Sequence, residues 1–224
     1  MSDATSRTRS LVALAPEERA LLKAELRKVE IETEKELIHL RRLQREEENE
    51  AVKHSTVRHL WINDAIQGSN GDIWIHALQT WERRDPGQPI TVDINSPGGS
   101  ITDGLALYDQ MMRMRRNGTK IDTRATGLVA SMAVILLQAG EERLMDERAK
   151  LLIHEGSATL QGNFSVGEQE DFRTFSTMLQ ADLLAILAER STLTERQIAT
   201  RWKRKDWYLG AQEALKLGFV DRIE

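Results

Sequence analysis

Hydrophobic and polar positions divide the chain into two parts at about residue 55. Residues 16–54 are almost entirely charged or helix-forming, and leucine or valine recurs there at intervals of three or four positions. Pro16 suits the first position of a helix, and the glutamates that follow favour the positive end of its dipole. The pattern predicts one long charged helix, either solvated or forming a coiled coil, preceded by a flexible leader over residues 1–15.

From residue 55 to the end, apolar runs of strand length alternate with segments of helical periodicity. Such alternation favours a parallel sheet in a single α/β domain over residues 55–224. In the helix expected at 70–84, Ile73, Ile75, Leu78 and Trp81 are predicted to face inward. Strands are expected at 57–64, 89–96, 119–130, 142–154 (two short strands), 207–210 and 219–223, and helices at 70–84, 101–118, 131–140, 167–191, 194–203 and 211–218.

Composition narrows the possible functions. The 224 residues carry a formal net charge of −4, so no basic surface for nucleic acid dominates. The absence of cysteine excludes thiol nucleophiles, disulfides and thiolate metal sites. No apolar run reaches the length of a signal-peptide core or a membrane span. We therefore predict a cytoplasmic protein that binds no membrane, no nucleic acid, no metal and no cofactor.

Ser131 and His154 are the first candidates for chemistry. Ser131 lies between a strand-like and a helix-like segment, where free N–H groups stabilise negative charge, and the N–H of Met132 is a candidate oxyanion donor. An ordinary helix cap is the alternative interpretation of this serine. His154 ends the apolar run KLLIH, at the strand end where ligands gather in α/β sheets, although a structural histidine is equally compatible with that position.

Two further sequence features could belong to the same site. The segment NSPGGS, residues 95–100, is a glycine turn whose N–H groups can face a cleft; Gly99 is a second candidate oxyanion donor. The segment lacks the spacing of a nucleotide-binding loop. A hydrolytic triad also needs a carboxylate to orient its histidine. Asp206 is a candidate for it, but the sequence pattern alone does not choose it over Asp103, Asp146 or Asp221.

Several of these segments together resemble the Clp protease proteolytic subunit family of serine peptidases. The resemblance rests on INSPGGSITDGLALYDQM, ATGLVASMAVILLQAGEERLM, KLLIHEG and DWYLGAQEALKLGFVDRI, in that order. It extends from about Val57 to the C-terminus. It implies a crotonase-like α/β fold of repeated β-β-α units around a mixed sheet, with the charged helix as an N-terminal extension.

The resemblance also implies roles for single residues. Ser131 corresponds to the nucleophile, His154 to the general base and Asp206 to the carboxylate that orients it. The N–H groups of Gly99 and Met132 correspond to the oxyanion hole. Ser100 and Ile101 correspond to an edge strand that aligns extended substrate.

The implied function is endopeptidase activity on unfolded or assembly-associated polypeptides inside a homo-oligomeric chamber, with heptameric rings stacked in pairs through the helix at 167–191. The implied partner is an AAA+ unfoldase or, for a phage maturation protease, capsid and scaffold proteins. Glu155 and Gly156 depart from the family pattern after the histidine, and the helix at 16–54 replaces its short axial loop. A crotonase-fold acyl-CoA enzyme and a non-catalytic ring or scaffold component are the alternatives.

Overall fold

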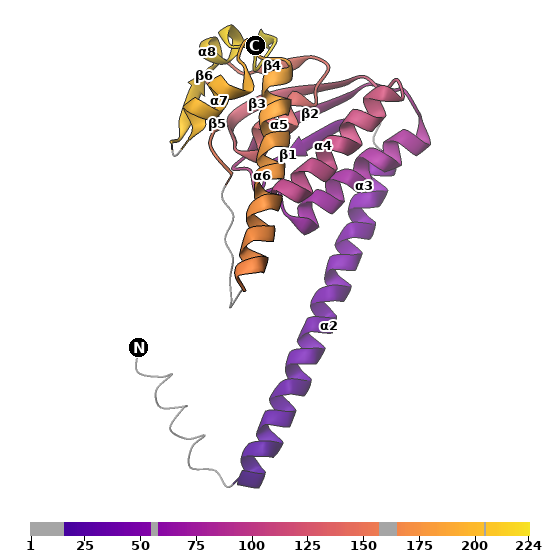
Figure 1. Ribbon diagram of the computed structural model, residues 1–224. Coiled ribbons are helices and arrows are strands. Elements are labelled where there is room, and N and C mark those ends of the chain that lie inside the picture. The colour runs from indigo at the N-terminus through magenta and orange to yellow at the C-terminus, as the bar shows by residue number, and fades with distance from the viewer. Residues whose placement is uncertain (1–15, 55–57, 157–164, 204) are drawn as a thin grey trace. The chain divides into compact units, whose positions relative to one another are not determined.

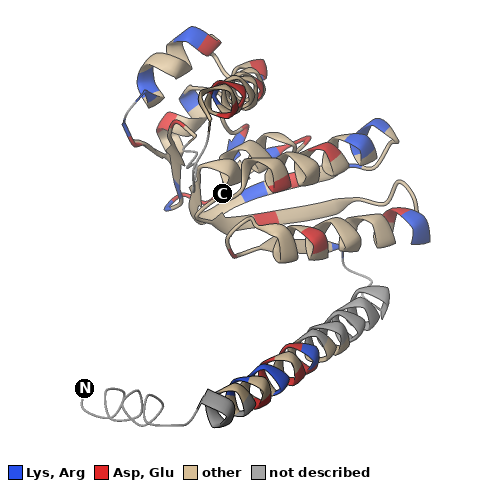
Figure 2. Ribbon diagram, turned by 60° about the horizontal axis from the view of Figure 1, so that its bottom comes forward, with Lys and Arg blue, Asp and Glu red and all other residues tan. Residues whose placement is uncertain are grey.

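The computed structural model describes residues 16–54, 58–156, 165–203 and 205–224, so the predicted leader lies outside the described residues. The chain divides into two compact units, Met1–Ala51 and Val52–Glu224. Helix α2 runs without interruption over Pro16–His54 (Figure 1). Side chains of both charges alternate along its described part (Figure 2). Leu26, Val29 and Leu40 are about half exposed there.

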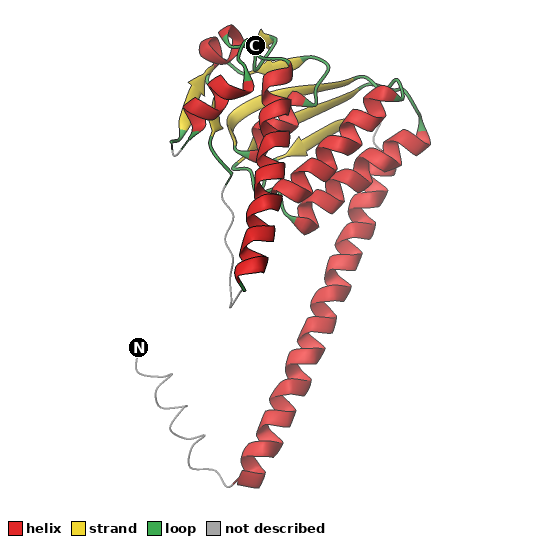
Figure 3. Cartoon of the chain, in the orientation of Figure 1, coloured by secondary structure: helices red, strands yellow, loops and turns green. Residues whose placement is uncertain are grey.

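The second unit contains strands and helices in alternating order, as expected (Figure 3). None of the described helices has a stretch long and apolar enough to cross a membrane. The elements of this unit are β1 His59–Ile62, α3 Gly68–Arg84, β2 Ile90–Ser96, α4 Ile101–Arg116, β3 Ile121–Ala130, α5 Met132–Gln138, β4 Arg143–Met145, β5 Lys150–Ile153, α6 Val166–Glu189, α7 Glu195–Trp202, β6 Trp207–Gly210, α8 Ala211–Lys216 and β7 Arg222–Ile223.

The sheet follows the order β1-β2-β3-β4-β7, with all of these pairs parallel. The long strand β3 has two partners on one side. Its first half pairs with β4 and its last residues, Leu128–Ala130, pair with β5. Strand β6 then pairs with β5 in the antiparallel sense. The parallel pairs agree with the expectation from the alternating pattern, and the antiparallel strand β6 makes the sheet mixed, as the family resemblance implied.

The core is built around α5, all of whose residues are buried. Helices α3 and α4 pack against each other beside the sheet. In α3, Leu78 and Trp81 are buried as predicted, but the inward positions before them are Gly71 and Trp74. Ile73 and Ile75 pack against the core but are only partly buried, so they lie less deep than predicted. Positions 71, 74, 78 and 81 keep the spacing of one helical face, and the large indole of Trp74 gains more from burial than a flanking isoleucine.

Candidate active site

Ser131 lies at the junction between β3 and α5, as the N-cap residue of α5. Its backbone has φ 55° and ψ −124°, the only positive φ of a described residue other than glycine. Its N–H donates to the carbonyl of Leu152, at 2.8 Å. Its side chain makes no capping hydrogen bond, so the ordinary cap interpretation does not describe this serine. A strained backbone of this kind is typical of functional positions, where the surrounding structure holds it in place.

His154 and Asp206 are brought together by the antiparallel pairing of β5 with β6. Ile153 lies opposite Trp207 in this ladder. His154 follows Ile153 and Asp206 precedes Trp207, so the two side chains occupy the next register position. The distance from His154 Nδ1 to Asp206 Oδ1 is 3.7 Å, a loose ion-pair distance. The Asp206 side chain is 57% exposed and also accepts a hydrogen bond from the Tyr208 hydroxyl.

Ser131 and His154 line the same pocket. The parallel pairing of β3 with β5 explains this, because Ala130 lies beside Leu152 and each strand ends within two residues of that pair. A serine, a histidine and an aspartate from three separate segments thus lie at one end of the sheet. The pocket is otherwise apolar, and its far wall is formed by α6 and α7.

The glycine turn after β2 packs directly against Ser131. Gly98 has φ 87°, and a Cβ added there would lie 2.7 Å from the Ser131 Cβ. The Gly98 N–H donates to Ser96 Oγ and the Ser100 N–H to the carbonyl of Ile66. Among the described residues, neither the N–H of Gly99 nor that of Met132 donates a hydrogen bond. Both groups are therefore available to a ligand beside Ser131.

Asp221, Asp103 and His59 lie in other parts of the structure. Asp221 binds Arg143 and Arg190, and Asp103 belongs to the first turn of α4. His59 pairs with the buried Asp93, with 2.7 Å between Nε2 and Oδ2. Within the described ranges, no group of three or more His, Asp or Glu side chains is arranged to hold a metal ion.

The prediction of an edge strand at Ser100 and Ile101 was wrong. Ser100 is the N-cap of α4, its hydroxyl accepts the N–H of Asp103, and Ile101 begins the helix. Serine at that position satisfies a free N–H of the first turn, which favours helix over strand. Ile101 nevertheless lines the pocket that contains Ser131. Our sequence analysis missed Trp202, the last residue of α7, which lines the same pocket and shows no motif.

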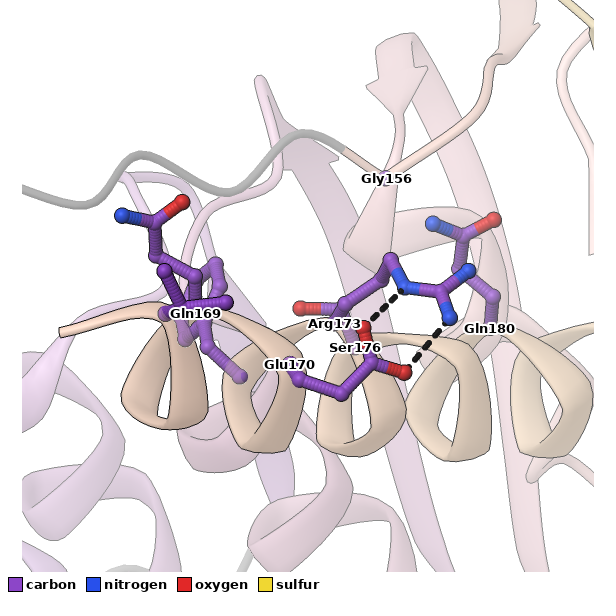
Figure 4. Close-up of a pocket in the computed structure, with 8 residues that line it drawn as sticks. Gly156, Gln169, Glu170, Arg173, Ser176 and Gln180 are labelled. Atoms are coloured by element: carbon purple, nitrogen blue, oxygen red, sulfur yellow. Dashed lines mark hydrogen bonds and ion pairs between the residues drawn. The ribbon is translucent and has the colours of Figure 1, made fainter.

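A second, larger pocket begins beside the first. Gly156 lines both of them, and the second continues along the N-terminal half of α6 with a volume of about 560 Å³. Figure 4 shows Gln169, Glu170 and Arg173 on this side of the helix, with Arg173 paired to Glu170 at 2.6 Å. Gly156 thus separates a small, mainly apolar pocket that contains Ser131 from a larger one lined by polar and apolar side chains of α6.

Comparison with known proteins agrees with this arrangement. Residues 44–224 match the Clp protease family model. The chain is 31% identical over 168 residues to the ATP-dependent Clp protease proteolytic subunit of Dehalococcoides mccartyi strain CBDB1, covering 74% of this chain and 81% of that protein. It is 33% identical over 171 residues to the ATP-dependent Clp protease proteolytic subunit 2 of Tropheryma whipplei, covering 74% and 90%. The chain therefore belongs to the Clp protease family and is a serine-type peptidase with the crotonase-like fold.

Proposed function

We propose that Ser131 is the nucleophile of this peptidase, that His154 is its general base, and that Asp206 orients the imidazole. One arrangement supports the assignment. Ser131, whose φ is 55°, and His154 line the same pocket, and His154 Nδ1 lies 3.7 Å from Asp206 Oδ1. A carboxylate at Nδ1 holds the proton there and leaves Nε2 free to accept the serine proton.

The reaction follows from these positions. His154 takes the hydroxyl proton as Ser131 Oγ bonds to the carbonyl carbon of the substrate. The resulting imidazolium is stabilised by Asp206 and returns the proton to the leaving nitrogen as the C–N bond breaks. Water, activated by the same imidazole, then hydrolyses the serine ester. Loose contacts such as the 3.7 Å separation tighten when substrate is bound in many hydrolases.

The oxyanion of the tetrahedral intermediate would be held by the N–H groups of Gly99 and Met132. Support comes from their lack of protein acceptors and from the packing of the glycine turn on Ser131. A donor of this kind lowers the barrier by about 3 kcal/mol. The N-terminus of α5 adds the positive end of a helix dipole at the same place.

The substrates are proposed to be polypeptides in extended or unfolded form. The pocket along α6, which continues from the active site past Gly156, has room for chain on one side of the cleaved bond. The names of the relatives, proteolytic subunits of ATP-dependent proteases, support a homo-oligomeric assembly and an ATP-driven partner. We propose rings of seven subunits stacked in pairs, which a native mass measurement on the 25.5 kDa chain would count.

A fluorophosphonate probe tests the assignment, since it reacts only with an activated serine. We expect labelling of the assembled wild-type protein at Ser131 and loss of both labelling and peptidase activity in Ser131→Ala, with activity falling about 10⁴- to 10⁶-fold. Labelling that persists in Ser131→Ala would place the nucleophile elsewhere. An acyl-CoA enzyme of this fold, or a structural ring component, predicts no labelling of the assembled protein at all.

A further inference from the structure

The glycine turn beside Ser131 is held by the loop at residues 63–67, which joins β1 to α3. The Ile66 N–H donates to the carbonyl of Gly98 at 2.9 Å, and the Ile66 carbonyl accepts the N–H of Ser100 at 2.7 Å. Ile66 also forms a parallel β-bridge with Gly99, and a Cβ on Gly99 would overlap the Ile66 carbonyl. The loop and the turn therefore form one closely packed unit.

Ser96, the last residue of β2, supplies the side chain that links this unit together. Its hydroxyl donates to the carbonyl of Asp64 at 2.6 Å and accepts the N–H of Gly98 at 3.2 Å. The residue is 1% exposed, so water does not replace these bonds easily. One buried hydroxyl thus joins the end of the strand, the loop and the turn.

The loop is itself fixed to α3. The Asp64 carboxylate accepts the N–H of Ala65 at 2.6 Å, and the Asn70 side chain donates to the carbonyl of Ala65 at 3.1 Å. Asn70 lies in the first turn of α3, whose buried residues belong to the core. The glycine turn is therefore supported, through the loop, by a packed helix.

These contacts engage the N–H groups on both sides of Gly99. The N–H of Gly98 is taken by Ser96 and the N–H of Ser100 by Ile66, whereas that of Gly99 donates to no acceptor among the described residues. A Cβ on Gly98 would lie 3.0 Å from the backbone nitrogen of Met132, so the turn lies directly beside the other proposed oxyanion donor. The direction of the Gly99 N–H thus depends on how its two neighbours are anchored.

We propose that Ser96 is a positioning residue of this peptidase, whose hydroxyl ties the glycine turn to the loop and so keeps the N–H of Gly99 directed at the oxyanion. Ser96 acts through the turn, because its side chain is buried. This inference rests on the proposed roles of Ser131 and Gly99. It adds a residue that lies outside the proposed triad and oxyanion hole.

The test uses full-length Ser96→Ala, with its active sites counted by fluorophosphonate titration to completion, so that unfolded protein does not enter the rate. We expect kcat per active site to fall about 10- to 100-fold, less than the 10²- to 10³-fold typical of a deleted donor. KM should change by less than about threefold, because the oxyanion exists only after attack. The affinity of a peptide boronate, whose tetrahedral serine adduct places an oxygen in the oxyanion hole, should fall by the same factor as kcat/KM.

Asn70→Ala loosens the same loop from the side of α3. It should lower kcat about three- to tenfold with KM unchanged, since small displacements near the reacting atoms reduce the rate. This variant keeps the test valid if Ser96→Ala does not fold.

Thr123→Val is the matched control, because it removes another buried hydroxyl. Thr123 is 0% exposed, and its hydroxyl donates to the carbonyl of Leu137 at 2.7 Å. The variant should lose stability and keep the wild-type kcat per active site and boronate affinity. An equal loss of kcat in Thr123→Val would contradict a specific role for Ser96.

The remaining outcomes separate this inference from the proposed function. If wild type is labelled at Ser131 but the variants at Ser96 and Asn70 keep wild-type kcat, or if kcat falls while boronate affinity does not, the positioning role is refuted and the nucleophile stands. If Ser131 is not labelled and cleavage does not depend on it, the proposed function fails and this inference fails with it.

Discussion

At the scale of single residues, the backbone of Ser131 is the most informative feature of the site. A φ of 55° costs a residue with a Cβ about 1–3 kcal/mol, which neighbouring contacts must offset. The hydrogen bond from its N–H to Leu152 and the close approach of Gly98 supply those contacts. The serine hydroxyl is thus presented by a backbone that other segments hold in place.

Gly98→Ala should therefore impair catalysis as well as folding. The new methyl group would lie 2.6 Å from the carbonyl of Ala130 and 2.7 Å from Ser131 Cβ, so the nucleophile must shift. We expect kcat to fall about 10²-fold, the usual effect of a displacement near 1 Å. Gly118→Ala is the control, because Gly118 has a similar φ of 91° but nothing within 4 Å of the added methyl group. It should cost about 1–2 kcal/mol of stability and leave kcat unchanged; equal losses of kcat in the two variants would contradict the argument.

Asp206→Asn should lower kcat by about 10²- to 10⁴-fold with little change in KM, because in the proposed mechanism Asp206 acts by orienting His154. Asp103→Asn, on the first turn of α4, is the matched control and should keep wild-type kinetics. Steady-state rates on one peptide measure both. A wild-type rate for Asp206→Asn would show that another group orients His154.

Prediction from sequence succeeded for the positions of residues that stand at the end of an apolar run. Ser131 and His154 stand at ends of strands, and apolar runs reveal such ends. Asp206 could not be chosen by pattern, because its role depends on the pairing of β5 with β6, a contact between distant segments. Trp202 was missed for a related reason: in the sequence it is one more apolar position of a short helix, and only packing places it in the pocket.

At the scale of elements, one buried ion pair joins strand β4 to the residue that precedes strand β7. Arg143 on β4 is 2% exposed and binds both oxygens of Asp221, beside the short strand β7. Gln138 of α5 and Arg190, which caps α6, complete the cluster. Partial burial opposes ionisation of Asp221, but hydrogen bonds and charge from Arg143 outweigh it and hold the pKa of Asp221 below its ordinary value of 3.8.

This pair should make stability depend on pH in the acid range. A carboxyl whose pKa is lower in the folded state adds stability above its ordinary pKa and loses it as pH falls through the folded pKa. We expect the free energy of unfolding of wild type to decrease below about pH 4. Asp221→Asn should be less stable by about 3 kcal/mol at pH 7, because it leaves the buried Arg143 without its anion. Denaturant titrations at pH 3 and pH 7 measure both effects; a difference between wild type and variant that does not shrink at pH 3 would contradict the account.

Element boundaries were predictable where a cap or a glycine ends the pattern. The capping boxes at Ser165 and Thr194 begin α6 and α7 close to the expected positions. The sense of β6 was not predictable, because its four residues show no periodicity that distinguishes parallel from antiparallel pairing. The start of α4 at residue 101 was predicted from the pattern, and only the edge strand that the family resemblance implied there was wrong, because Ser100 caps the helix.

At the scale of the whole molecule, the helix α2 and the peptidase unit have different tasks. The described apolar side chains of α2, such as Leu26 and Leu40, are half exposed, whereas those of Val52–Glu224 form a continuous core. An exposed apolar stripe along a charged helix is suited to pairing with another helix. We infer that residues 16–54 act in assembly and add little to the stability of the peptidase unit.

Deletion of residues 1–54 should leave a folded unit whose Tm changes by no more than about 3 °C, since less than about 1 kcal/mol is lost. We expect the oligomeric mass, measured by native mass spectrometry, to differ from that of the full chain. The full-length double variant Leu26→Lys and Leu40→Lys should reproduce that change if the apolar stripe is responsible. Unfolding of the truncated chain would refute the division of tasks.

The pairing of β5 between β3 and β6 has a consequence for the newly made protein. The segment that contains Ser131 is synthesised before β5, which positions His154. Asp206 is synthesised last and lies close to the C-terminal end. A shift of β5 by one residue would turn the imidazole to the opposite side of the sheet. In the proposed triad, the three side chains can therefore come together only after β6 has been synthesised and has paired with β5.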